Sequence, residues 1–448
     1  MGKTMFIERA LDEITKKNKV VVGFDLGNVC SQISYCRADQ SMPDTLSLVM
    51  GEEQYNIPTL LCRKADTNGT PTWLVGRDAL KAIEEKQGVS VENLLHLVRE
   101  NAPVQVGEET FEADYLLEIY IRKTLAILSA YVRTDAIGAV AFTMEEMEPM
   151  LMDVVRAVVR RVCSAGTEVW FLSHEDCFFQ YIIHQPSEMW IHDVLLYDYR
   201  RDGITSHILQ MNRKTSPVAC FMETSRFPQM RMPDTVGGLE IEKEAFYHKL
   251  DAMLLEILQK QCGERAVTSV FLLGDCFSKD WCKESLKYMC KNRRVFQGNN
   301  LFSKGACYGA RERLYPSTLS TSYVYLSPDK LRANIGMECD RGQKEIYLPI
   351  LNAGTSWYDA KKEFDVMLVR NNVISLTITP VDGSKTRVAQ ISLEGLYVRG
   401  NKTNRIGLRF YMEDPEAVYI EIQDKGFGEI FPSTGRIWKE CLPLEAIS

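Results

Sequence analysis

Two rhythms of hydrophobic and polar residues follow one another along this chain. Up to about residue 315, short apolar runs such as 20–24 and 270–273 alternate with segments like 113–133, where apolar residues recur every three or four positions. Short apolar runs bounded by turn residues are typical of buried strands, and the longer spacing is typical of amphipathic helices. Because strands alternate with helices, this part is predicted to be an α/β domain with helices on the faces of its sheets.

The same pattern predicts the individual elements of the α/β part. Strands are predicted over 20–37 as a hairpin, 55–62 as an edge strand interrupted by Pro58, 139–142, 166–172, 194–221 as two or three strands, and 268–273. Helices are predicted from residue 76, over 113–133 and 145–163, from Glu175, from Gly237 to about Gln261, and over 279–290 and 303–315.

From about residue 321 the apolar residues alternate with polar ones over short segments, such as 373–378 and 405–410. Alternation with a period of two, broken by turn residues, predicts an antiparallel β-sandwich. The Ser/Thr-rich stretch 316–322 separates the two patterns. We therefore expect four parts: an N-terminal helical extension at 1–18, an α/β domain at 19–315, a linker at 316–330 and a sandwich at 331–448.

Composition excludes several classes of protein. The 448 residues are 45% hydrophobic and 25% charged, which are ordinary globular values. A net charge of −7 provides no polycationic surface, so nucleic acid is not expected as a ligand. The chain contains no apolar run of about 18 residues, so no membrane association is expected. Thirteen cysteines without a C-x-x-C pair predict reduced core residues of a cytoplasmic protein, and His174 and His184 are too isolated to predict metal ligands.

Three apolar strands end in Asp, Gly or both, at Asp25-Leu26-Gly27, at Asp198 and at Gly274-Asp275. An Asp at the end of a strand can hold Mg²⁺ through water, and Gly lets backbone N–H groups approach a phosphate closely. Each segment alone is better explained as an ordinary turn. The order and spacing of all three favour a nucleotide-binding clamp.

The order of these segments resembles the Hsp70 chaperones, within the actin-like ATPase superfamily. The segments similar to family motifs are 23–27 (first phosphate motif), 73–79, Glu175, 197–198 (second phosphate motif), 235–240, 271–274 (adenosine motif) and 306–310, followed in the second part by 323–326, 335–338 and 348–354. The resemblance implies an actin-like, Hsp70-type ATPase fold with two lobes. A sandwich similar to the Hsp70 peptide-binding domain would follow it.

The resemblance also implies site residues. ATP or ADP with Mg²⁺ is the implied ligand, bound weakly or not at all. Asp25 and Asp198 would position Mg²⁺ through water, and Glu175 would orient the attacking water. The residues implied to contact the nucleotide are Gly27, Asn28, Arg200, Arg201, Gly203, Gly237, Gly238 and Gly274. No peptide-binding residues are predicted.

Several departures from the family bear on activity. Arg200 and Arg201 stand where the second phosphate motif has glycines. Either arginine pairs with phosphate, or the loop no longer holds phosphate. Asp275 brings a negative charge towards the nucleotide, and the second-lobe insertion subdomain is reduced to one helix and a strand before Gly274. We find no counterpart of the family's catalytic lysine and expect no helical lid after the sandwich.

Two hypotheses from different classes remain. In the first, the protein is an Hsp70-like chaperone with a degenerate nucleotide site and, if active, a slow Mg²⁺-dependent ATPase. In the second, it is a pseudo-ATPase scaffold whose sandwich holds an extended peptide or a strand of a protein partner by β-augmentation. The altered glycine loop, the reduced subdomain and the missing lysine favour the second. The sequence indicates neither an oligomeric state nor the identity of a client.

Overall fold

The computed structural model describes residues 19–49, 51–65, 70–233, 240–278, 280–327, 329–341, 344–368, 372–381, 384–398 and 404–444. The chain divides into two compact units, of which the first runs to Tyr323 apart from 219–221, and the second begins at Val324. This boundary lies inside the predicted linker 316–330, where α10 (Thr318–Ser322) and β17 (Tyr323–Leu326) occur. The predicted extension 1–18 and the residues Gly237 and Gly238 lie outside the described residues.

The first sheet of the first unit has the strand order β11-β10-β1-β2-β3. Its strands are β1 (Val20–Leu26), β2 (Cys30–Arg37), β3 (Asp44–Thr45), β10 (Ile137–Thr143) and β11 (Glu168–Leu172). β1 pairs antiparallel with β2 and parallel with β10, which is parallel to β11. The central strands are continuous apolar runs because both faces of the sheet are covered. Phe24 stacks on Phe142, with ring centroids 5.1 Å apart.

The second sheet of this unit repeats the strand order of the first, as β16-β15-β12-β13-β14. Its strands are β12 (Asp193–Arg200), β13 (Gly203–Asn212), β14 (Val218–Phe227), β15 (Val267–Leu273) and β16 (Arg294–Gln297). Again the first two strands form an antiparallel hairpin, and the last two are parallel to the first. When the five strands named for each of these two sheets are numbered along the chain, both sets have the order 5-4-1-2-3.

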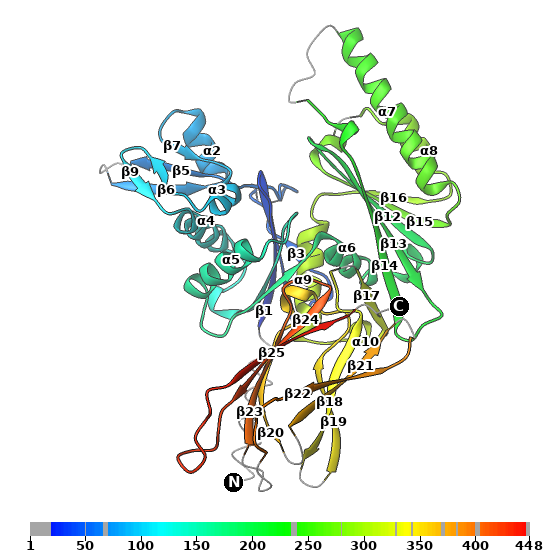
Figure 1. Cartoon of the computed structure of the whole chain (residues 1–448). Coiled ribbons are helices and arrows are strands. Elements are labelled where there is room, and N and C mark those ends of the chain that lie inside the picture. Colours follow the sequence, from blue (N-terminus) through cyan, green and yellow to red (C-terminus); the bar gives the residue numbers. More distant parts are fainter. Residues whose placement is uncertain are drawn as a thin grey trace. The chain divides into compact units, whose positions relative to one another are not determined.

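Helices connect and flank these strands (Figure 1). They are α4 (Ala113–Leu128), α5 (Pro149–Val162) and α6 (His174–Ile183) around the first sheet, and α7 (Glu240–Cys262), α8 (Lys283–Met289) and α9 (Leu301–Leu314) in the second half of the unit. In α7 the buried residues Leu250, Leu254 and Leu258 recur every four positions, as expected for a helix packed on one face.

The predicted strand at 55–62 is wrong as a single element. The chain instead forms β4 (Ile57–Pro58), which pairs with β2, and β5 (Leu61–Ala65), which belongs to a separate three-stranded sheet. The break follows Pro58, which has no N–H to continue a ladder. The small sheet comprises β5, β6 (Pro71–Val75) and β7 (Val89–Val91), accompanied by α2 (Gly76–Glu84), α3 (Leu94–Glu100) and the hairpin of β8 (Val104–Val106) and β9 (Glu109–Phe111).

The second unit consists of two four-stranded antiparallel sheets, as the alternating pattern predicts. One has the order β19-β18-β21-β22, with β18 (Ala333–Arg341), β19 (Lys344–Leu351), β21 (Val373–Pro380) and β22 (Arg387–Ser392). The other has the order β20-β23-β24-β25, with β20 (Lys362–Leu368), β23 (Asn404–Tyr411), β24 (Ala417–Asp424) and β25 (Ile437–Pro443).

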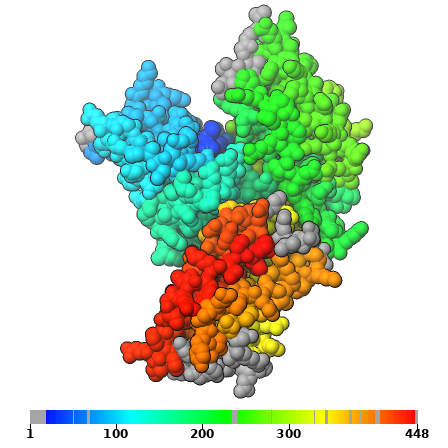
Figure 2. Space-filling view, viewed as in Figure 1, coloured from blue at the N-terminus to red at the C-terminus, as the bar shows by residue number. Residues whose placement is uncertain are grey.

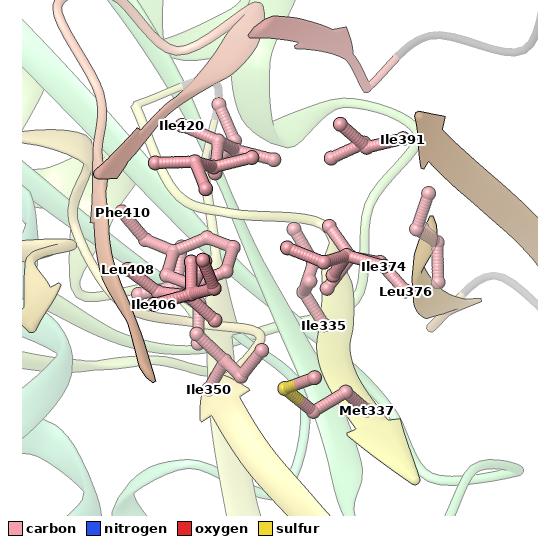
Figure 3. Packing of buried hydrophobic residues seen from close by; sticks show 14 of the residues in the cluster. Ile335, Met337, Ile350, Ile374, Leu376, Ile391, Ile406, Leu408, Phe410 and Ile420 are labelled. Carbon is pink, nitrogen blue, oxygen red and sulfur yellow. The ribbon is translucent and has the colours of Figure 1, made fainter. Parts of the chain in front are cut away.

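Alternate residues of both sheets meet in one hydrophobic core (Figure 3). Ile335 and Leu376 from one sheet and Leu408 and Ile422 from the other are completely buried. On β23 the residues Ile406, Leu408 and Phe410 are buried, while Arg405 and Arg409 on the opposite face are exposed. This period of two is the physical basis of the sequence signal.

The two glycines Gly23 and Gly305 allow backbones in the first unit to approach closely. A Cβ on Gly23 of β1 would overlap the carbonyl oxygen of Ser303 in α9. A Cβ on Gly305 of α9 would overlap the carbonyl oxygen of Cys177 in α6. α9 therefore packs directly on both β1 and α6, which fixes the base on which the candidate site is built.

A buried ion pair fixes the opposite end of α6. His184 caps the helix and lies with Nε2 3.1 Å from Oε1 of Glu312 in α9, while its ring stacks on Tyr308. Glu312 also accepts hydrogen bonds from the backbone N–H and the hydroxyl of Ser317, the N-cap of α10. Burial raises the pKa of Glu312, but the hydrogen bonds from His184 and Ser317 outweigh it and lower the pKa to about 2.

Gly305→Ala should destabilise the protein by about 2 kcal/mol or more, because the added methyl group must push α9 away from α6. Gly298→Ala is the matched control, since nothing lies within 4 Å of a Cβ at that position. Unfolding by urea, followed by circular dichroism, measures both variants. Equal stability of the two variants would contradict the close approach of the helices.

Glu312→Gln should reduce the stability of the protein at neutral pH and flatten its acid dependence. The folded-state pKa of Glu312 is about 2, below its ordinary value of 4.5, so the carboxylate stabilises the fold above the ordinary value. That contribution is lost as the pH falls from about 5 towards 2. Free energies of unfolding measured at intervals over this range, with the exposed Glu84→Gln as control, test this. A variant with the same acid dependence as the unmodified protein would contradict the assignment.

Candidate functional site

A pocket of about 630 Å³ lies within the first unit. Figure 2 shows the surface hollowed between the cyan and green parts of this unit, with blue residues of the N-terminal strands at the base. Of the residues that the sequence assigns to the site, Asp25, Gly27, Asn28, Asp198, Arg200, Arg201 and Gly274 line this pocket. Glu175 and Gly203 do not, and Gly237 and Gly238 lie outside the described residues.

The repeated strand order explains why Asp25 and Asp198 line the same pocket. Each is the sixth residue of the first strand of its sheet. Each also lies opposite the last residue of the fourth strand, Thr143 for Asp25 and Leu273 for Asp198. Two signals 173 positions apart in the sequence are thus one site in space.

Arg200 holds the carboxylate of Asp198. Its Nε donates a hydrogen bond to Oδ2 of Asp198 at 2.9 Å, and its Nη1 donates to Oε2 of Glu145 at 3.2 Å. Glu145 follows β10 of the first sheet, so the guanidinium bridges the two halves of the unit. Burial opposes the charge of Arg200, but Asp198, Asp25 and Glu145 together raise its pKa above the ordinary value. Arg200 therefore stays charged.

His174 is a pocket residue that the sequence reasoning missed. Its Nε2 lies 3.4 Å from Oδ1 of Asp25, and its ring lies flat on Phe302, with centroids 3.9 Å apart and planes 4° apart. The helix predicted from about Glu175 begins at His174, since Ser173 caps α6 in a capping box with Asp176. The Ser-x-x-Asp spacing was the signal that could have located the first helical residue.

Glu175 points to a different set of partners. Its Oε1 accepts a hydrogen bond from Thr224 at 3.3 Å and lies 3.7 Å from Nδ1 of His207. Burial lowers the pKa of His207 although Glu175 opposes the shift. Neighbouring residues on a helix point about 100° apart, so His174 faces the pocket where Glu175 does not.

The glycines of the predicted phosphate loops have packing roles in this structure. Gly274 has a φ of +93°, and a Cβ there would overlap the carbonyl oxygen of Tyr199. A Cβ on Gly27 would overlap the carbonyl oxygen of Cys30 in the turn of the first hairpin. Gly203 has a φ of +138° and lies against the backbone of Phe227. Backbone contacts within the fold therefore explain why these three positions have no side chain.

A chain of side-chain amides closes one side of the pocket. Gln32 donates from Nε2 to Oδ1 of Asn56 at 2.6 Å, and Asn56 donates from Nδ2 to Oδ1 of Asp275 at 3.4 Å. Oε1 of Gln32 is buried and has no hydrogen-bond partner among the residues that the structure describes.

The pocket is negatively charged overall. Five carboxylates line it against two guanidinium groups; the acidic residues are Asp25, Glu145, Asp198, Asp202 and Asp275. Burial, and then the fields of Asp25 and Asp275, raise the pKa of the Cys30 thiol to about 12. The thiol therefore stays protonated and is not a nucleophile at neutral pH.

Two observations on the described residues concern metals and membranes. Within those ranges, no group of three or more His, Cys, Asp or Glu side chains is placed to hold a metal ion. Nor does any helix in the described part of the chain combine the length and apolar character needed to cross a membrane. None of the thirteen cysteines forms a disulfide.

Comparison with known proteins gives two family matches. Residues 42–328 match the model described as the C-terminal part of a family of unknown function, DUF5716. Residues 330–444 match a domain of unknown function, DUF8552. The two matches meet close to the boundary between the compact units. No curated protein matches the chain.

Proposed function

This chain belongs to the DUF5716 family, and we propose that it is a divergent Hsp70-like protein with a degenerate nucleotide pocket and no ATP turnover. In this proposal the first unit is a pseudo-ATPase scaffold of the actin-like superfamily. The second unit binds an extended segment of another protein. We place this activity in the cytoplasm, away from membranes and nucleic acid.

One observation carries the proposal: both sheets of the first unit have the order 5-4-1-2-3 and present an Asp at the same position to one pocket. Two such sheets with a shared cleft are what the Hsp70 resemblance implies for this part of the chain. Residues 23–27 and 197–198 lie towards the ends of the first strands, β1 and β12, and 271–274 lies at the end of β15, which supports the proposal.

The charges in the pocket favour the inactive alternative. A polyphosphate entering it meets more carboxylates than guanidinium groups. Arg200 is already paired with Asp198 and Glu145, so the alternative in which it pairs with phosphate requires breaking both contacts. Glu175, the residue implied to orient water, faces His207 and Thr224. Phosphoryl transfer depends on positioned cations and an oriented nucleophile, and neither is favoured here.

The second unit supports a binding function. It has two four-stranded antiparallel sheets, and β19, β22, β20 and β25 are their outer strands. An outer strand can add a strand from a partner through its main-chain N–H and C=O groups. We therefore propose that the partner is an extended segment of another protein. This segment is either an unfolded peptide or a strand of a folded protein, and both would add to an outer strand in the same way.

The nucleotide part of the proposal predicts binding of ATP or ADP no tighter than about 1 mM and no phosphate release above background. Calorimetric titration of ATP and ADP, with and without MgCl₂, measures the binding, and a coupled phosphate assay measures turnover. Because no turnover is expected, phosphate release should be the same for Asp25→Asn as for the unmodified protein. Asp39→Asn is the matched control, because Asp39 is an exposed residue outside the pocket.

Phosphate release that requires Mg²⁺ and disappears in Asp25→Asn but persists in Asp39→Asn would overturn the pseudo-ATPase proposal. It would establish the first hypothesis, an active and slow ATPase.

The binding part of the proposal predicts that the full chain binds unfolded polypeptide with micromolar affinity, about 1–100 μM. A peptide array identifies a ligand, and hydrogen exchange with and without that peptide locates it. New protection should be confined to an outer strand of the second unit: 344–351, 362–368, 387–392 or 437–443. Absence of binding on the array, or protection confined to the first unit, would contradict a peptide-binding sandwich.

A further inference from the structure

The positive charge between the carboxylates of Asp198 and Glu145 comes from a side chain of the protein, Arg200. Arg200 donates from Nε to Asp198 and from Nη1 to Glu145, over 2.9 and 3.2 Å. Asp198 is almost fully buried, and its side chain retains 10% of its exposure. A buried carboxylate needs a counter-charge, and here a guanidinium supplies it.

The remaining carboxylate of the predicted metal pair is also occupied. Asp25 retains 15% of its side-chain exposure and has His174 Nε2 at 3.4 Å from Oδ1. The positive charge of Arg200 also lies in the field of Asp25. Asp25 and Asp198 therefore both face cationic or N–H groups of the protein.

This donor set does not fit Mg²⁺. Magnesium requires oxygen ligands in near-ideal octahedral geometry, and the protein usually supplies one or two of them as carboxylates. Here the carboxylates of Asp198 and Glu145 share one guanidinium, and a divalent ion beside them would be repelled by it. Neither Asp25 nor Asp198 belongs to a described group of three or more potential metal ligands.

We infer that Arg200 takes the place of a divalent metal in this pocket, so that the pocket is complete without Mg²⁺ and selects against ligands that arrive with one. The inference deepens the proposed function, since it names the cation of the same pocket. It also assigns a cause to the specificity: a metal-bound polyphosphate would place a second cation beside Arg200. A ligand that arrives without a cation meets no such repulsion.

Titration of MnCl₂ and MgCl₂ alone, without nucleotide, into the full chain tests this inference. The unmodified protein should show no saturable site up to about 10 mM metal. Arg200→Gln should gain one site that binds Mn²⁺ at least about tenfold more tightly, because it leaves Asp198 and Glu145 without their counter-ion. Arg200→Gln/Asp198→Asn should lose it again.

Two further variants serve as controls. Arg133→Gln removes the same charge from an exposed residue paired only with Asp135 in the described structure, and it should bind no metal. Arg200→Lys keeps a positive charge beside Asp198 and should also bind none. Mn²⁺ binding by the unmodified protein that is lost in Asp198→Asn would overturn the inference.

The melting temperature keeps the test decisive if Arg200→Gln folds poorly. A metal that binds only the folded state raises its melting temperature. MnCl₂ should therefore raise the melting temperature of Arg200→Gln and leave that of the unmodified protein unchanged. An Arg200→Gln protein that metal does not stabilise would overturn the inference. Since no nucleotide is present, these results do not depend on whether the pocket binds ATP.

Discussion

The candidate site depends on how the charge of Asp198 is compensated. This carboxylate is buried at the end of β12, and an uncompensated buried charge costs several kcal/mol or neutralises by taking up a proton. Arg200, two residues further along the same strand, supplies the compensation and reaches Glu145 on the other half of the unit. Residues two apart on a strand point to the same face, so a single short segment delivers both the acid and its counter-ion. The pair of Asp198 and Arg200 therefore influences the charge of the pocket and whether a metal ion or a phosphate can bind there.

Close backbone packing sets the position of that pair. Gly23 and Gly305 bring β1, α9 and α6 into direct contact, and Gly274 brings the end of β15 against the backbone of Tyr199. Asp25 follows Gly23 by two residues, His174 begins α6, and Asp198 is the neighbour of Tyr199. These three pocket side chains therefore stand within two residues of a tight contact or on a helix that makes one. Displacing any of these backbones would move the polar groups by amounts comparable with a hydrogen-bond length.

Local signals in the sequence were sufficient for most elements and for part of the site. The strand ends at Asp25 and Asp198 are local features, and the repeated strand order brings them to one pocket.

The two alternatives for Arg200 could not be separated, because its second partner, Glu145, lies 55 residues earlier and pairs with it only in the fold. Likewise, His174 is defined by its stacking on Phe302, 128 positions away. For Gly274 a nucleotide contact in the adenosine motif was the prediction, whereas a contact with Tyr199 accounts for the glycine. The prediction of one edge strand at 55–62 was wrong because β5 pairs with β6 and β7, and no local sequence pattern reveals this pairing. The nucleotide roles of these residues stay predictions.

The polar groups of the pocket connect the two halves of the first unit. Arg200 reaches Glu145, and Asn56 reaches Asp275. Partly exposed contacts of this kind each contribute little to stability. Opening the cleft would nevertheless separate both pairs and leave Asp198 and Arg200 paired only with each other. In an actin-like ATPase, bound nucleotide and metal would perform this bridging between the lobes. In the arrangement proposed here, side chains of the chain perform it, which favours a scaffold whose two halves stay joined without a ligand.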